Sequence, residues 1–448
     1  MRWPDFTGQL DWADYDDDDV SAGDRELLND LHALHCLHYL HMLRKRARPS
    51  AAGGDDDGSA TAPRARPDRD DVKRRFDAIR PRQFKTMFRM DRDAFDDLCQ
   101  TLAPQLPTRR KTALPVWLKV AVTLRYLAGG SHHDIGFGFS IVASTFYRVV
   151  DAVLDAIHAT RRVDLDSLFI EHEDGTWEWD VDKLQALEHE FATKKGPWIR
   201  GIFGAIDGVA VKILCPPASQ TDHVKEFYNR KGFYALVCQG VCDARRRFLF
   251  MDARMEGSCP DSLAFGASLL GVRMEMNPPP LPFMLVGDAA YEAQQWMLTP
   301  WPGVTLPTDK DAFNFFQSSA RIEIECAFGL LCRRWGILWR PLPAERLART
   351  TRIVTACAKL HNWCIDHNDV EGPDQFDGRM LEPQVDLDPQ DECEDLERSR
   401  PHRRARLREV NMLRAELTQS IKERNGCRPK LTGNQPEAAD RLSQMSAQ

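Results

Sequence analysis

Apolar residues recur with two different periods along the chain, and the change between them predicts its organisation. Over 84–157 they return every three or four positions, a spacing typical of helices. Over 204–288 they gather in short runs bounded by glycine, proline and aspartate, which predicts strands. The four runs are 204–213, 233–241, 248–254 and 283–288. Helical spacing returns at 319–337 and 353–365. The pattern predicts an α/β fold, with a sheet flanked by helices and a helical module before it.

The helical module ends in a pattern that resembles a helix-turn-helix motif. A short helix over 134–139 and a turn at 140–142 lead into a third helix, whose apolar face runs from Phe146 to Ile157. The exposed start of this third helix carries residues suited to DNA contact, namely Ser144, Thr145, Tyr147 and Arg148. The alternative is a packing module without a ligand, because Asp151 and Asp155 on the same helix would repel phosphates.

The remaining segments lack the composition of a packed core. The first part is acidic and predicts disorder, except for one helix over 27–43. The histidines of that helix recur every third residue, so they do not gather on one face of a helix with about 3.6 residues per turn. This favours a partner-binding surface over a metal site. The patterns predict five segments, at 1–75, 76–160, 161–198, 199–367 and 368–448. They are a disordered acidic region, a helix-turn-helix-like module, an acidic connection with a short helix near 184–191, a strand-rich domain, and an acidic and basic tail that is disordered or forms a lone helix.

One aspartate interrupts the first strand on an apolar face. Because side chains on a strand alternate between faces, Asp207 is expected to share a face with Phe203, Ala205 and Val209. An unpaired carboxylate in such a layer is costly or shifts its pKa. Asp207 therefore predicts a cation, a hydrogen-bond network or a metal beside it.

Two more acids interrupt apolar surfaces in the same way. Asp288 closes the run 283–288 at the sheet edge where α/β folds bind ligands, and Glu325 lies on the apolar seam of the helix over 319–337. A divalent cation, Mg²⁺ or Mn²⁺, would relieve the repulsion among these carboxylates and would suit phosphoryl transfer. Two alternatives stay open: the three acids serve unrelated salt bridges or caps, or Glu323 is the acid on the seam.

Composition narrows the class of protein. The 448 residues carry a formal net charge of −7, but the acids are concentrated near the ends, so local basic patches matter more than the total. The 12 cysteines include no Cys-x-x-Cys pair, which favours reduced thiols in an intracellular protein. No signal peptide or membrane span is expected from the apolar runs. A basic cluster at 44–48 is consistent with a nuclear protein, and a cytoplasmic one is the alternative.

Five motifs occur in order: Gly204-Ala205-Ile206-Asp207-Gly208, Phe227-Tyr228-Asn229-Arg230-Lys231-Gly232-Phe233, Gly257-Ser258 with Asp261-Ser262, Gly287-Asp288-Ala289-Ala290-Tyr291 and Ile324-Glu325-Cys326-Ala327-Phe328-Gly329. In this order they resemble the DDE endonuclease domain of PIF/Harbinger-type transposases, and the resemblance extends over residues 84–366. It implies an RNase H-like sheet, and a metal-binding triad of Asp207, Asp288 and Glu325 that cleaves DNA phosphodiester bonds. It also suggests a Myb-like accessory protein, and a homo-oligomer is a further expectation. The alternative is a domesticated DNA-binding or scaffold protein that keeps the fold without catalysis.

The chain departs from the family pattern at two places. Ala289 and Ala290 replace a small polar pair, and Pro260 stands where a histidine is common. Asp261 either supports the metal ligands or caps its helix, and the cap is the preferred interpretation. Several basic residues near the motifs suit DNA phosphate contacts, with a solvated surface as the alternative. They are Lys225, Arg230, Lys231 and Arg321.

Overall fold

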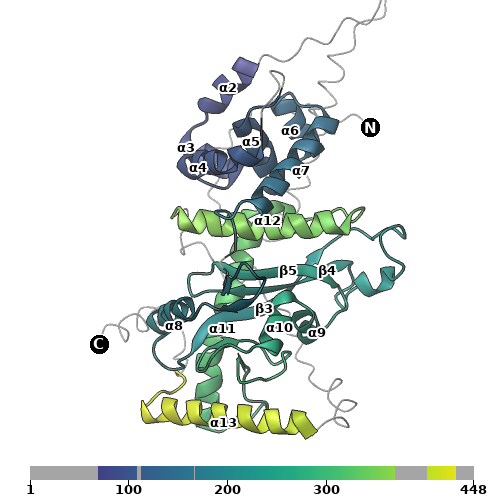
Figure 1. Cartoon of the computed structure of the whole chain (residues 1–448). Coiled ribbons are helices and arrows are strands. Elements are labelled where there is room, and N and C mark those ends of the chain that lie inside the picture. Colours follow the sequence, from purple (N-terminus) through teal and green to yellow (C-terminus); the bar gives the residue numbers. More distant parts are fainter. Residues whose placement is uncertain (1–68, 108–112, 166, 369–400, 430–448) are drawn as a thin grey trace, which may run out of the picture. The chain divides into compact units, whose positions relative to one another are not determined.

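The computed structural model describes residues 69–107, 113–165, 167–368 and 401–429 (Figure 1). All the described residues belong to one compact unit of the chain, 67–448. The helix expected over 27–43, the basic cluster after it and most of the predicted tail lie outside the described residues.

Six helices form the module that the apolar periodicity predicts. They are α2 to α7, at Arg69–Asp77, Pro81–Phe88, Arg92–Leu102, Val116–Leu127, His132–Gly138 and Ala143–Ala159, with a 3₁₀ turn, η1, at Ala103–Gln105. The first helices bury a cluster of aromatic rings, in which the centroids of Phe84 and Phe88 lie 4.6 Å apart. Helix α2 begins before the boundary expected at residue 76, because Val72 and Phe76 both join this core.

Helices α6 and α7 meet at 99° across residues 139–142, where Ser140 has a positive φ of 53°. This angle lies within the range of helix-turn-helix motifs. No single helix among the described residues is long and apolar enough to cross a membrane. Helices α6 and α7 reach that length and apolar composition only together, and they are bent by 99°.

A five-stranded mixed sheet forms the centre of the second half of the chain. Its strands are β3 (Ile202–Lys212), β4 (Ala235–Cys242), β5 (Phe248–Glu256), β6 (Met284–Val286) and β7 (Met297–Leu298). They lie in the order β5-β4-β3-β6-β7. Strand β3 is antiparallel to β4 and parallel to β6. The four strands expected from the apolar runs are confirmed, whereas the short edge strand β7 was not expected.

Helices cover both faces of this sheet (Figure 1). They are α8 (Val181–Lys195), α9 (Asp261–Gly266), α10 (Leu269–Met276), α11 (Thr308–Arg334) and α12 (Leu347–Asp366), with 3₁₀ turns η2 at Val224–Phe227 and η3 at Gly336–Trp339. Helices α11 and α12 share one hydrophobic cluster with Ala205, whereas α8, α9 and α10 share a second cluster with Ile206. The predicted α/β class, with a mixed sheet flanked by helices, is confirmed.

One side chain of β3 lies on the face opposite to the one expected. The pairing of β3 with β6 slips between Ile202 and Gly204. Phe203 therefore packs in the second cluster with Ile206, while Ala205 packs in the first. The expectation that Phe203 shares the face of Asp207 is wrong, because strict alternation fails at a strand irregularity.

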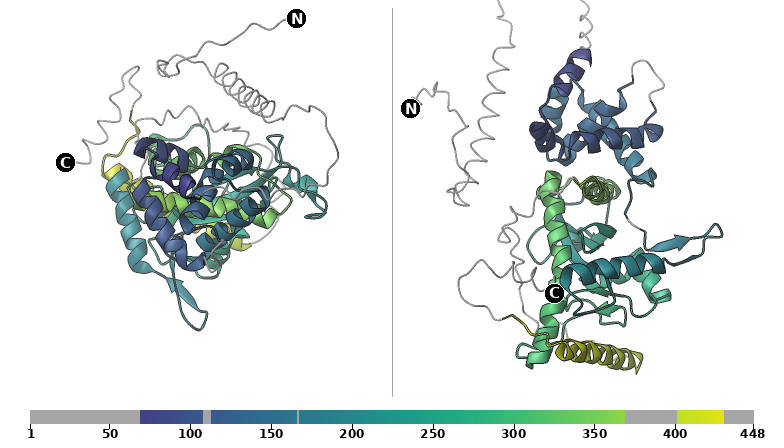
Figure 2. Two further views of the ribbon diagram at one scale, coloured as in Figure 1. Left: turned by 90° about the horizontal axis from the view of Figure 1, so that it is seen from above. Right: turned by 90° about the vertical axis from the view of Figure 1, so that its left-hand side faces the viewer.

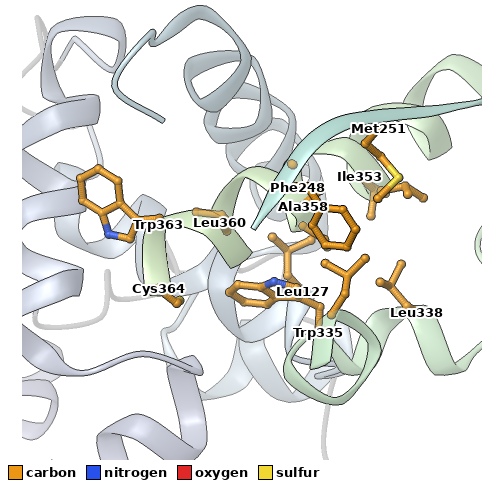
Figure 3. Close-up of a cluster of buried hydrophobic side chains, with 14 of the residues drawn as sticks. Leu127, Phe248, Met251, Trp335, Leu338, Ile353, Ala358, Leu360, Trp363 and Cys364 are labelled. Carbon is orange, nitrogen blue, oxygen red and sulfur yellow. The ribbon is translucent and has the colours of Figure 1, made fainter. Parts of the chain in front are cut away.

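Helix α12 connects the helical module with the sheet (Figure 3). The side chain of Asn362 accepts a hydrogen bond from Phe248 N at 2.8 Å and donates one to Phe248 O at 2.8 Å, so it pairs with edge strand β5 as another strand would. The indole nitrogen of Trp363 donates to Ala94 O at 3.0 Å. These bonds give the Leu360-His361-Asn362 segment a structural role.

The segment expected as an acidic connection, 161–198, is more ordered than predicted. It holds a hairpin of β1 (Phe169–Glu171) and β2 (Trp177–Trp179), which projects from the sheet in Figure 2. It also holds α8, which buries Leu184 and Leu187 in the second cluster. Helix α8 therefore belongs to the layer that covers the sheet, and the acidic residues around it concealed this role.

The tail expected to be disordered contains a helix, α13, at Pro401–Glu423. In Figure 2 it lies across the first part of α11. The buried guanidinium of Arg414 donates to Thr299 O at 3.0 Å, and the indole of Trp301 donates to Thr418 Oγ1 at 3.1 Å. For 401–423 disorder is wrong and the alternative, a helix, is confirmed. Its packing was not expected, because hydrogen bonds of this kind leave no apolar periodicity in the sequence.

Candidate active site

Asp207 and Asp288 occupy matching places on neighbouring parallel strands. Ala205 of β3 pairs with Val286 of β6, and each aspartate lies two residues further along. Asp207 Oδ1 accepts a hydrogen bond from Gly208 N at 2.8 Å, and Asp288 Oδ1 accepts one from Ala290 N at 2.9 Å. Both bonds come from backbone amides, so the orientation of the two aspartates needs no polar side chain at Ala290.

The two aspartates repel each other. Burial and, next, the carboxylate of Asp288 raise the pKa of Asp207 to about 7, while the guanidinium of Arg321 opposes this rise. The Asp207 side chain is 20% exposed, so water screens the repulsion only in part. This is the arrangement that favours a bound cation.

Glu325 faces the same place from helix α11. Arg321, one turn earlier on the helix, forms an ion pair with Glu325 Oε1, and the same nitrogen lies 3.5 Å from Asp207 Oδ2. A single guanidinium therefore links an acid of β3 with an acid of α11. Glu325 was expected on an apolar seam, yet its side chain is 32% exposed, whereas that of the alternative, Glu323, is 1% exposed.

Glu323 has a different environment on the same helix. Its side chain is 1% exposed and pairs with Lys194 at 2.8 Å, Lys195 at 2.5 Å and Arg246 at 2.8 Å. Burial alone would raise the pKa of Glu323, but Lys195 and Lys194 outweigh burial and lower it to about 2. Glu323 therefore binds α8 and the β4–β5 turn to α11, and it is not the acid that faces Asp207.

Asp261 approaches β3 from the side of α9. It is the first residue of that helix and makes no capping bond, since Pro260 occupies the N-cap position. Its Oδ1 accepts a hydrogen bond from Gln239 Nε2 at 2.8 Å. A Cβ added to Gly208 would lie 1.9 Å from this oxygen, so the carboxylate fills the space that the glycine leaves. The preferred interpretation of Asp261 as a helix cap is wrong.

Residues 206–362 match the family model described as DDE superfamily endonuclease. This segment of the chain is therefore similar to that family. The chain is 27% identical over 328 residues to the Homo sapiens protein named "Putative nuclease HARBI1", and the match covers 72% of this chain and 87% of that protein. It is 25% identical over 324 residues to "Protein ALP1-like" of Arabidopsis thaliana, which covers 66% of this chain and 73% of that protein. No solved structure matches the chain.

Asp207, Asp288 and Glu325 fit a divalent cation by their chemistry, because Mg²⁺ and Mn²⁺ prefer carboxylate oxygens. Among the described residues, no three His, Cys, Asp or Glu side chains are grouped closely enough to hold a metal ion as they stand. The Glu325 carboxylate is paired with the Arg321 guanidinium. The place beside Asp207 and Glu325 is thus occupied by a positive charge that belongs to the chain itself.

A basic turn lies close to Asp261. The buried side chain of Asn229 accepts hydrogen bonds from Lys231 N at 3.0 Å and Phe233 N at 3.2 Å, which shapes the turn and leaves Arg230 and Lys231 exposed. Both positive charges act against the rise in the pKa of Asp261, a rise that burial and then Asp288 produce. The sequence placed these basic residues near the motifs, and the structure brings them to the acids.

Lys225 is exposed on η2, just before this turn. The backbone of its neighbour Glu226 accepts a hydrogen bond from Ser258 N at 2.9 Å, which joins η2 to the loop before Asp261. Lys225 therefore belongs to the same basic surface.

The remaining predicted DNA-binding residues lie on α7 in the helical module. Ser144 and Arg148 are exposed and Thr145 is half-buried, and the Arg148 guanidinium bonds to Ser144 O at 3.3 Å and to Thr145 Oγ1 at 3.4 Å. The objection that acids on α7 would repel phosphates loses force. Asp151 pairs with Arg349 at 2.6 Å, and Asp155 pairs with Arg352.

Two residues of the site were missed in the sequence. Gln239 links Asp261 to Tyr291, because its Oε1 accepts a hydrogen bond from the buried Tyr291 hydroxyl at 2.6 Å. Gln239 is a buried polar residue in the otherwise apolar strand β4. Asp207 was identified as a polar residue that interrupts an apolar strand. Gln239 interrupts β4 in the same way, so the sequence contained the pattern that could have identified it.

Proposed function

We propose that the chain is a divalent-metal-dependent DNA endonuclease of the PIF/Harbinger transposase type, built on an RNase H-like domain. The metal ligands in this proposal are Asp207, Asp288 and Glu325. The observation that carries it is the Arg321 guanidinium, which pairs with Glu325 and lies 3.5 Å from Asp207. These acids come from different elements and share one positive charge, as ligands of one ion would.

The proposed reaction is hydrolysis of a phosphodiester bond, without a side-chain nucleophile. When bound, a divalent cation activates the attacking oxygen and stabilises the leaving one. The chain's own residues hold the acids in position. Gly208 N and Ala290 N orient the two aspartates, and the Tyr291–Gln239–Asp261 chain of hydrogen bonds supports β3 from the other side.

The proposed DNA contacts lie on two surfaces. The basic turn with Lys225, Arg230 and Lys231 would hold phosphates near the acids, where backbone contacts position a duplex without reading its sequence. The start of α7, with Ser144, Thr145 and Arg148, would contact DNA through the helix-turn-helix-like module. The basic cluster at 44–48 motivates a nuclear location, and the family resemblance motivates a Myb-like accessory protein. A homo-oligomer is a further part of the proposal.

Incubation with labelled duplex DNA tests the proposal. The purified protein should cleave the duplex with Mg²⁺ or Mn²⁺ and should not cleave it in EDTA. Asp207→Asn should be inactive although it folds. Equal cleavage by the variant and the wild type would reject the proposed site.

A second candidate function is DNA binding without catalysis, as in a domesticated protein that keeps the fold. The observation that favours it is again Arg321, because a guanidinium that stayed between Asp207 and Glu325 would exclude the metal. DNA binding by a wild-type protein that neither cleaves DNA nor binds Mn²⁺ would support this candidate.

A further inference from the structure

We propose that Arg321 is an internal counter-cation that holds Asp207 and Glu325 in the metal-free protein and moves to a DNA phosphate when a divalent cation binds. The inference rests on the proposed function, since it assumes that these acids are metal ligands. It adds a positioning residue and predicts that metal and DNA bind cooperatively.

The geometry shows that Arg321 and a metal ion need the same oxygens. The guanidinium pairs with Glu325 Oε1 and lies 3.5 Å from Asp207 Oδ2. A divalent cation between these acids would bring two positive centres within a few ångströms, where their repulsion is strong. Metal binding and the present position of Arg321 therefore exclude each other.

Arg321 pairs with an acid that reaches the surface, whereas the cations around Glu323 pair with a buried one. Glu323 is 1% exposed and holds three basic side chains that are 40%, 20% and 30% exposed, so the acid of that network cannot be reached by solvent. Arg321 is 22% exposed and Glu325 is 32% exposed, so their ion pair reaches the surface. A long, partly solvated side chain of this kind can change its rotamer without opening the core.

The released guanidinium would face a substrate phosphate. Arg230 and Lys231 act on Asp261, a carboxylate that also feels Asp288, so positive charge lies within electrostatic reach of these aspartates. A planar guanidinium suits two phosphate oxygens at once. If DNA captures Arg321, DNA must raise the affinity for metal, and by thermodynamic reciprocity metal must raise the affinity for DNA by the same factor.

The test measures Mn²⁺ binding rather than cleavage, from the electron paramagnetic resonance signal of free Mn²⁺. Titrations are run on the full chain with and without a short duplex, and a duplex-only blank corrects for Mn²⁺ bound by DNA. Arg321→Gln should raise Mn²⁺ affinity without DNA by about tenfold, the equivalent of one charge-assisted hydrogen bond. The duplex should raise the Mn²⁺ affinity of the wild type by a similar factor and that of the variant very little.

A matched control is available on the same helix. Arg428 pairs with Asp311 near the start of α11 at 2.9 Å, about 21 Å along the helix from Glu325. Arg428→Gln removes an arginine ion pair of α11 in the same way and should leave Mn²⁺ affinity unchanged. Arg321→Lys keeps the charge but not the planar fork. It should shift Mn²⁺ affinity in the same direction by a smaller factor, and it serves if Arg321→Gln does not fold.

The outcomes separate this inference from the proposed function. Unchanged or weaker Mn²⁺ binding by folded Arg321 variants would overturn the counter-cation, provided that Asp207→Asn still abolishes binding. If Asp207→Asn binds Mn²⁺ as the wild type does, the proposed metal site itself is rejected. Tighter binding by Arg321→Gln, with loss of the DNA effect, supports the inference.

Discussion

Glu323 and Glu325 lie two residues apart on α11, so the effect of replacing glutamate with glutamine can be compared at two different sites. Glu323 is 1% exposed and pairs with Lys194, Lys195 and Arg246, whereas Glu325 is 32% exposed and pairs with Arg321. Glu323→Gln should destabilise the fold. Glu325→Gln should leave the fold intact and remove a proposed metal ligand.

The expected loss for Glu323→Gln follows from its ion pairs. Burial would raise the pKa of Glu323, but Lys195 and Lys194 lower it from its ordinary value of 4.5 to about 2. This difference corresponds to roughly 3 kcal/mol of folding free energy, within the range of about 3–5 kcal/mol for breaking a buried ion pair. Because the pKa is lower in the folded state, this stabilisation is complete above pH 4.5 and is lost as pH falls from 4.5 toward 2.

Urea unfolding of both variants at pH 7 and at pH 3 tests this reasoning. At pH 7 Glu323→Gln should lose roughly 3 kcal/mol and Glu325→Gln less than about 1 kcal/mol. At pH 3 the difference between Glu323→Gln and the wild type should shrink. Equal losses for the two variants, or a loss for Glu323→Gln that does not change with pH, would refute the assignment of these two acids.

Three further substitutions test the site. Asp207→Asn in EDTA should stabilise the protein by roughly 2–4 kcal/mol at pH 8, because the raised pKa of about 7 makes the folded state lose stability as pH rises from about 4 to 7. This gain should disappear at pH 4 in thermal or urea unfolding, and a gain of equal size at both pH values would contradict it. Gly208→Ala should lower the free energy of unfolding by about 1–3 kcal/mol, because the added Cβ would lie 1.9 Å from Asp261 Oδ1. An unchanged urea midpoint would show that the Asp261 carboxylate moves freely. Arg230→Gln should weaken DNA binding about equally for all sequences and reduce the salt dependence of log Kd by about one, as measured by fluorescence anisotropy.

Much of the sheet and the three acids could be predicted from the sequence. Strand β3 carries a charge in an otherwise apolar run, and that contrast identifies Asp207. Glu325 was singled out by helical spacing, but the buried acid of α11 is Glu323, which was the alternative. The strand predictions succeeded because they depend on local periodicity within a single element, and the roles of the three acids stay predictions.

Other features depend on contacts between distant segments and could not be predicted in this way. The face of Phe203 depends on a slip of β3 against β6. The place of α13 depends on hydrogen bonds from Arg414 to residue 299, which no periodicity records. Asp261 suited a helix cap by residue type, but its bond to Gln239 crosses from α9 to β4.

Metal-dependent cleavage by three single variants tests the central claim most directly. Wild-type protein, Asp207→Asn, Asp288→Asn and Glu325→Gln are incubated with the same end-labelled duplex in Mn²⁺ and in EDTA. The account predicts cleavage by the wild type in Mn²⁺ alone, and rates lower by about a hundredfold or more for each of the three variants. Wild-type cleavage that persists in EDTA, or full activity in any one folded variant, would contradict it.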